Sequence, residues 1–308
     1  MQKNNYIAVV GGVNVDIGGR PYQPLQRRDS NPGKIHISLG GVGRNIAHNL
    51  RLLGERQVYL LTAFGDDAFA LKIEHSCKEI GIDISRARLI AGGKTSTYIY
   101  LCNEEGEMEI ALSDMDICRE INPAYLTSQE ALLNGARLVV IDGNLSQDAL
   151  LWLAKHCEAP IFADPVSAAK AEKLLPILGK IHTLKPNRLE AEVLSGVRIE
   201  DEESLNRAAE ILLEKGVKRV FISLGSEGVF AAEGEQRVRA VGQPICLKNS
   251  SGAGDAFMAA LVRSFPETED LKACAEQAAM AAAIAVESEE TVNPALSTEL
   301  LRVRMENL

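Results

Sequence analysis

A carboxylate follows three small residues in the segment "SSGAGDAF", Ser250 to Phe257. Glycine tolerates backbone angles that other residues avoid, and the first turn of a helix leaves N–H groups unpaired. Gly252, Ala253 and Gly254 can therefore present N–H groups to an anion, such as a phosphoryl group during transfer. Asp255, beside this anion hole, can accept the proton of an attacking hydroxyl. The simpler alternative is an aspartate that only complements the helix dipole.

A second group of polar residues lies near the N-terminus. In "GGVNVDIGG", Asn14 and Asp16 are two residues apart, which puts both on the same side of an extended chain. They could hold the hydroxyls of a sugar, or they could be an ordinary polar strand end. In "GGVGRN", Gly41 allows a ligand to approach the backbone and Asn45 offers both a donor and an acceptor, although a helix-packing turn explains the glycines equally well. The segment does not match the dinucleotide fingerprint G-x-G-x-x-G, because Ile46 stands at its last position.

Two further clusters follow apolar runs. In "KPNRLEAE", Asn187 and Glu190 have the spacing of a capping box at a helix start, which is the simpler interpretation. The functional interpretation adds a hydrated Mg²⁺, which is held by one or two carboxylates and by substrate phosphates. "SLGSEG" contains Ser223, Gly225 and Gly228, a glycine-rich turn that a plain hairpin also explains.

The elements that must position these residues alternate between strands and helices. Apolar, β-branched runs end in Gly, Asp or Asn and are followed by helical patterns, which predicts βα units on a parallel sheet. Helices are expected over residues 43–54, over 201–216 with Asp201 as cap and Gly216 as stop, and over the Ala-rich 270–288. Ligands bind beyond the carboxyl ends of the strands in such sheets. The expected strands lie within 6–12, 138–144, 160–167, 181–187 and 219–225.

One segment departs from this rhythm. Residues 91–117 alternate in the manner of a strand pair, with "NEEGE" as the turn. We expect this segment, with part of 12–40, to form a small β lid on a single domain that spans residues 1–308.

Composition narrows the class of protein. The 308 residues are 46% hydrophobic and carry a net charge of −9, so the chain can bury a core but lacks a basic face for nucleic acid. The six cysteines form no CxxC pair, and no apolar run is long enough for a membrane span or a signal peptide. We expect a cytoplasmic protein with reduced thiols and a small-molecule ligand, and no interaction with nucleic acid or membrane.

Taken together, "GGVGRNIAHNLRLLG", "GDD", "KPNRLEAE", "SLGSEG" and "SSGAGDAF" resemble the ribokinase-like, or PfkB, carbohydrate kinase family over essentially the whole chain. The resemblance implies a three-layer α/β/α sandwich with a mainly parallel sheet and a β lid, and transfer of phosphate from MgATP to a sugar hydroxymethyl group. It implies that Asp255 is the base and that Gly252, Ala253 and Gly254 form the anion hole. The other implied roles are sugar binding by Asn14, Asp16, Gly41 and Asn45, nucleotide binding by Asn187, Ser223, Gly225, Gly228 and Asn293, and Mg²⁺ binding through water by Glu190.

Other motifs are similar to the branch of this family that phosphorylates pseudouridine: "DSNPGKIHISLGGVGRNIAHNL", "ALSDMDI", "ADPVSAAK" and "IHTLKPNRLEAE". Pseudouridine carries a ring N–H that uridine lacks, and a buried acceptor for it would reject uridine. We expect Asp114 to accept from the ring and Lys170 to donate to a carbonyl, although salt bridges or solvent exposure would also explain these two residues. Asn249 stands where the family commonly has aspartate, which leaves a requirement for K⁺ open.

Other interpretations stay open at this level. A kinase for another nucleoside or for ribose shares the same motifs, and lid-mediated dimers in relatives make a homodimer an analogy only. A non-catalytic nucleoside sensor is disfavoured by the presence of Asp255, and a dinucleotide oxidoreductase by the missing fingerprint.

Overall fold

The central sheet of the computed structural model, which describes residues 5–241, 246–265 and 270–307, has eight strands. These are β1 (Ile7–Val10), β4 (Val58–Leu61), β9 (Leu138–Asp142), β10 (Ile161–Asp164), β11 (Ile181–Leu184), β12 (Arg219–Ser223), β13 (Val229–Glu233) and β14 (Gln236–Ala240). Their order is β14-β13-β12-β11-β10-β9-β1-β4. The pairs from β12 to β4 are parallel, and β13 and β14 extend one edge antiparallel. The expected mainly parallel sheet is therefore confirmed.

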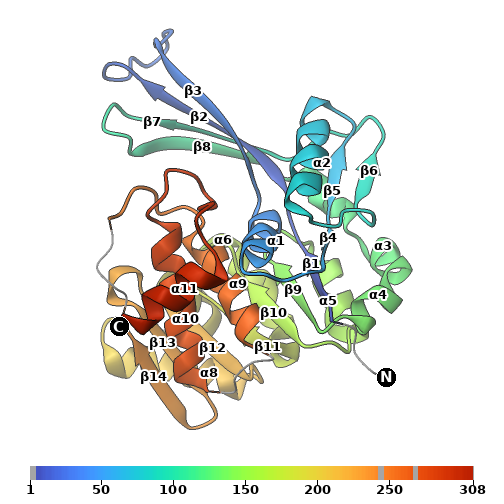
Figure 1. Cartoon of the computed structure of the whole chain (residues 1–308), viewed down its shortest axis with the longest axis vertical. Helices are drawn as coiled ribbons and strands as arrows, with labels where there is room; N and C mark the ends of the chain where they lie inside the picture. The colour runs from blue at the N-terminus through green and yellow to red at the C-terminus, as the bar shows by residue number, and fades with distance from the viewer. Residues whose placement is uncertain (1–4, 242–245, 266–269, 308) are drawn as a thin grey trace.

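Helices cover both faces of this sheet (Figure 1). Because side chains alternate along a strand, Ile7 and Val9 join one buried cluster while Ala8 and Val10 join the other. The first cluster packs against α1 (Val42–Leu52), α2 (Ala68–Ile80), α9 (Ala253–Ser264), α10 (Leu271–Ala285) and α11 (Thr298–Glu306). The second packs against α3 (Pro123–Ser128), α4 (Glu130–Gly135), α5 (Gln147–His156), α6 (Ala168–Ala171), α7 (Arg188–Ser195) and α8 (Glu202–Glu214).

The helix boundaries follow local chemistry. Asp201 caps α8 by accepting from the backbone N–H of Ser204 at 2.8 Å, and Gly216 follows the helix with a φ of 98°. Both residues were expected at these positions.

A second, four-stranded sheet projects from the sandwich (Figure 1). Its order is β3 (Gly33–Gly40), β2 (Asn14–Pro21), β7 (Thr97–Cys102) and β8 (Met108–Asp114). We call it the small sheet. Only residues 11–13 separate β2 from β1, and Gly41 alone separates β3 from α1. A two-stranded sheet of β5 (Ala63–Gly65) and β6 (Arg88–Ile90) lies nearby in the chain.

Side chains on the two faces of the small sheet differ in character. The register pairs Ile17 with Ile37 and Ile99, and Ile99 with Leu112, so these residues share an apolar face. The opposite face carries Asp16, with side chains from its neighbours Ser38 and Tyr98.

Within the described ranges, the helices include none with both the length and the apolar character that a bilayer crossing requires.

Candidate active site

Asp255 lies in the first turn of α9 and is 7% exposed. Its Oδ2 accepts a hydrogen bond of 2.9 Å from Nδ2 of Asn45 on α1, although 210 residues separate the two in sequence. This contact joins the "GGVGRN" and "GAGD" motifs in one site.

The start of α9 has the properties of an anion hole. Gly252 occupies the left-handed region at a φ of 81°, and no side chain among the described residues caps the helix. The first N–H groups of the helix are therefore left for a ligand, in the direction favoured by the helix dipole.

Burial changes the acidity of the nearby carboxyl group. Desolvation, reinforced by repulsion from Asp164, raises the pKa of Asp255 to about 8, while Asn45 and Lys185 oppose the shift. A carboxylate with a pKa near the working pH is suited to accept a proton in a reaction.

An ion pair that the sequence alone did not reveal lies beside this carboxylate. Lys185 Nζ is 3.0 Å from Oδ2 of Asp164, and both side chains are buried. The two residues follow β11 and end β10, which are adjacent and parallel. Their positions in "LKPN" and "ADP", directly at strand ends, were the available signal.

Asn187 and Glu190 form the expected capping box at the start of α7. Asn187 Oδ1 accepts from the Glu190 N–H at 2.9 Å, and Glu190 Oε2 accepts from the Asn187 N–H at 2.8 Å. Ser223 adjoins this helix start, because its N–H donates to Pro186 O at 2.9 Å. Gly225 and Gly228, both at positive φ, complete the turn between β12 and β13.

The capping box engages one carboxylate oxygen of Glu190, Oε2. Burial, with repulsion from Asp164, raises the pKa of Glu190 to about 7, although Lys185 partly opposes the shift. A second cation near Glu190 would offset the remaining shift, and a carboxylate oxygen is the ligand that Mg²⁺ prefers. The side chain therefore fits a hydrated Mg²⁺.

The sugar-binding candidates meet at the base of the small sheet. Nδ2 of Asn14 donates to Oδ1 of Asp16 at 2.6 Å. Gly40, next to Gly41, lies directly against Asp16, because a Cβ there would overlap its carboxylate. Gly41 itself has a φ of 98° and touches the backbone of Gly12, so a side chain is not tolerated.

Asp142, which sequence reasoning overlooked, ties these loops together. Its Oδ2 accepts from the N–H groups of Gly12 at 2.8 Å and Gly43 at 2.9 Å. Beside it, Lys170 Nζ donates to Oδ1 of Asn144 at 2.6 Å, so the predicted ligand Lys170 lies at the same sheet edge. The strand-end position of Asp142 in "LVVIDGN" was the missed signal.

Two residues that were expected to bind ligands, Asp114 and Asn293, have other positions or partners in the structure. Asp114 is exposed and pairs with Thr97, which pairs with Val15; it therefore lies on the face of the small sheet opposite Asp16. Asn293 is buried, but its amide is engaged with the backbone of Ile284 at 2.6 Å and of Ala295 at 3.0 Å.

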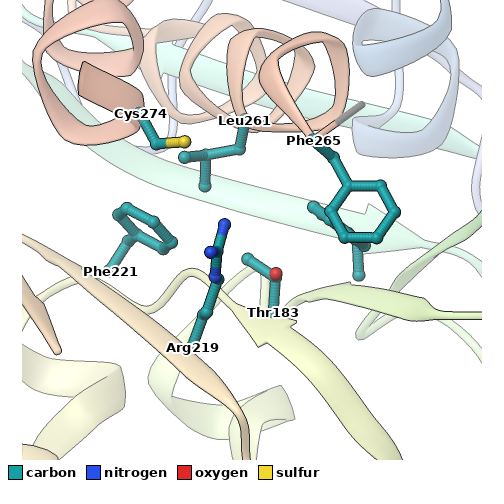
Figure 2. A pocket seen from close by; sticks show the side chains of 7 residues that line it. Thr183, Arg219, Phe221, Leu261, Phe265 and Cys274 are labelled. Carbon is teal, nitrogen blue, oxygen red and sulfur yellow. The ribbon is translucent and has the colours of Figure 1, made fainter. Parts of the chain in front are cut away.

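Two cavities lie away from these residues. One of about 10 Å³ holds about a single water and is too small for a substrate; it is lined by Phe162, Thr183, Arg219, Phe221, Leu261, Phe265 and Cys274 (Figure 2). The other has about 460 Å³, within the range of small-molecule pockets, and lies between β14, α10 and α11. Its lining includes Val241, Ala279, Met280 and Met305.

Comparison with known proteins agrees with the fold. The pfkB family carbohydrate kinases match residues 4–299. Pseudouridine kinase of Escherichia coli K12 is 37% identical, with 96% of this chain and 95% of that protein covered. The uncharacterized sugar kinase YeiI of the same organism is also 37% identical, over 97% of this chain and 83% of that protein. The crystal structure of ribokinase from Thermotoga maritima, 21% identical, has a TM-score of 0.87, with 99% of this chain and 100% of that chain covered.

The fold and site thus define a ribokinase-like kinase. The chain belongs to the pfkB carbohydrate kinase family and is an ATP-dependent phosphotransferase that acts on a small sugar or nucleoside.

Proposed function

We propose that this kinase transfers the γ-phosphoryl group of ATP to the 5′-hydroxyl of pseudouridine, giving pseudouridine 5′-phosphate. The observation that carries the reaction type is the buried Asp255 beside the uncapped start of α9. The choice of nucleoside is supported by the similarity to the E. coli pseudouridine kinase across 96% of the chain.

In the proposed reaction, the 5′-oxygen forms a bond to the γ-phosphorus while the bond from that phosphorus to the β-phosphate oxygen breaks. Asp255 accepts the hydroxyl proton, and N–H groups of Gly252, Ala253 and Gly254 stabilise charge on the phosphoryl oxygens. Asn14, Asp16, Gly41 and Asn45 hold the ribose. The whole chain acts as one kinase domain whose small sheet is the lid and excludes water when closed.

ATP and Mg²⁺ are the proposed cofactors. Glu190 would hold Mg²⁺ through water, next to Asn187, Ser223, Gly225 and Gly228 on the phosphate side. The metal would neutralise charge on the phosphates. We assign the adenosine to the C-terminal end of α10, where the carbonyl oxygen of Val286 accepts from Lys248 N at 2.9 Å in the segment leading to Gly252. Asn293 supports this region indirectly, because its side-chain amide donates to Ile284 O near the end of α10.

No role is proposed for K⁺. Asn249 donates from Nδ2 to the carbonyl oxygen of Glu289 at 3.0 Å, and its Oδ1 accepts from the Ser251 N–H at 2.9 Å. This side chain therefore presents no anionic ligand to a cation.

A panel of nucleosides and pentoses with MgATP tests the substrate. We expect kcat/KM for pseudouridine to exceed that for uridine by at least about 10²-fold, because a site built around the extra N–H leaves a buried acceptor unpaired with uridine. Lys170→Ala should raise KM. Asp114→Ala should leave the ratio unchanged, because Asp114 is exposed on the face of the small sheet opposite Asp16. Unchanged discrimination in Asp114→Ala would remove that residue from the site, in keeping with its position on the far face.

The equal identity of YeiI makes another sugar or nucleoside the second candidate, and a preference for one in the panel would replace pseudouridine. Nucleoside binding without ADP release would instead favour a sensor.

A homodimer through the small sheet is also proposed. Its apolar face leaves Ile35 76%, Ile37 46%, Ile110 60% and Leu112 70% exposed. Contiguous exposed apolar surface of this kind marks an interaction site, and the face lies away from Asp16, so pairing with a second copy would leave the sugar site open.

Light scattering should therefore give twice the chain mass of 33.3 kDa. Ile37→Asp should halve that value, whereas Leu151→Asp, on α5 and similarly exposed at 44%, should not. A monomeric wild type at micromolar concentration would contradict the dimer.

We place the protein in the cytoplasm. All six cysteines are free thiols, and ATP is the phosphate donor.

A further inference from the structure

Lys185 carries a buried charge that its single partner does not saturate. An ammonium group has three N–H donors. Within the described part of the chain, Nζ of Lys185 has one bonded partner, Asp164 at 3.0 Å, and the residue is 5% exposed. Burial disfavours the charged form, but Asp164, Glu190 and Asp255 outweigh this effect and raise the pKa of Lys185, so the ammonium persists.

The Lys185 ammonium lies directly against the anion hole. A Cβ on Gly254 would lie 2.7 Å from Nζ of Lys185, so the cation rests directly on the turn whose N–H groups begin α9. A side chain at 254 would displace the Lys185 ammonium from this turn.

Three carboxyl groups surround Lys185 and favour its charged form. Asp164, Glu190 and Asp255 are the carboxylates whose fields act on it. The ammonium thus lies between the base, the anion hole and the residues on the phosphate side of the site.

We propose that Lys185 is a catalytic residue that contacts the oxygens of the transferred phosphoryl group with its free N–H donors. The proposal rests on the phosphotransfer described above. During transfer the hydroxyl proton goes to Asp255, the leaving oxygen stays on ADP, and Lys185 keeps its proton while it neutralises charge on the phosphoryl oxygens. Asp164 holds the ammonium in place before ATP arrives.

The rival explanation is structural: Lys185 only neutralises Asp164. Removing one member of a buried pair leaves the other charge uncompensated, whereas removing both does not. Lys185→Met, Asp164→Asn and the double variant Asp164→Asn/Lys185→Met therefore separate the two roles.

Titration calorimetry with Mg²⁺ complexes of ADP and of the non-hydrolysable ATP analogue AMP-PNP measures γ-phosphate contact without any acceptor. We expect Lys185→Met to lose about 10-fold or more in affinity for AMP-PNP, with much less change for ADP. We also expect kcat to fall about 10²- to 10³-fold. The double variant should have a melting temperature near that of wild type, but it should keep the losses in kcat and in preference for AMP-PNP. Lys185→Arg, which keeps the positive charge, should retain part of the wild-type kcat and part of the preference for AMP-PNP.

Recovery of wild-type kcat and AMP-PNP preference in the double variant would overturn the proposal. If Lys185→Met does not fold, the double variant alone decides, since it contains no orphaned charge. If wild-type protein phosphorylates no nucleoside in the panel, the proposed function fails, yet the AMP-PNP comparison still tests Lys185.

Discussion

Asp255→Asn should leave the fold intact and lower turnover by about 10²- to 10⁴-fold, the usual contribution of a positioned general base. The amide is the same size as the carboxyl group, and its oxygen can still accept from Asn45 Nδ2, which lies 2.9 Å from Oδ2 in the native site. Only the capacity to take a proton is removed. Steady-state assays with pseudouridine and MgATP give the value, and near-normal turnover would exclude Asp255 as the base.

The wild type should reveal the same group through its pH profile. Because the pKa of Asp255 is raised to about 8, the base is largely protonated in the free enzyme at neutral pH. The logarithm of kcat/KM should rise with pH and level off above about 8, and this limb should be absent from the residual activity of Asp255→Asn.

Stability provides an independent control for the same variant. The folded state keeps the Asp255 proton up to a pKa of about 8, whereas the unfolded chain releases it near 3.8. This group therefore stabilises the folded state less as pH rises between those values. The amide introduced by Asp255→Asn does not titrate, so the variant should gain melting temperature relative to wild type when both are moved from pH 5 to pH 8.

Gly252→Ala is expected to lower kcat by about 10²-fold or more and to lower the stability of the protein. A Cβ at this position would overlap the carbonyl oxygen of Thr291, and the φ of 81° is itself unfavourable for alanine. The turn must shift, and displacement of anion-hole donors by about 1 Å costs on this scale.

Gly196→Ala is the matched control. Gly196 has a φ of 79° at the end of α7, but a Cβ there meets nothing within 4 Å. It carries the same backbone strain without the collision, so kcat should stay near wild type. Equal losses in the two variants would show that strain, rather than displacement of the anion hole, explains the result.

Much of this fold can be predicted from local sequence patterns. Buried strands such as β1 consist of apolar residues that end in glycine, and α8 has its cap and its stop within the segment. The main clusters could be located because each directly follows such a strand. The Asn45 to Asp255 contact could be inferred only through the family resemblance, since nothing local connects residues 210 positions apart.

Other features depend on strand order and register, which single residues do not specify. The Lys185 to Asp164 pair exists because β10 and β11 are neighbours. The face on which Asp114 lies depends on the alignment of β8 with β7, where a bulge between Leu101 and Cys102 shifts the register. A one-residue shift reverses the face of every following side chain, so alternation within the strand was insufficient.

The single-residue joint at Gly41 links two events that are usually considered separate. Since Gly41 alone connects β3 to α1, a tilt of the small sheet, the proposed lid, would be transmitted to the helix that carries Asn45 and, through its amide, to the Asp255 carboxylate. Binding of the sugar and orientation of the Asp255 carboxylate would thus be coupled through one residue. A sugar that binds without closing the small sheet would therefore not be phosphorylated.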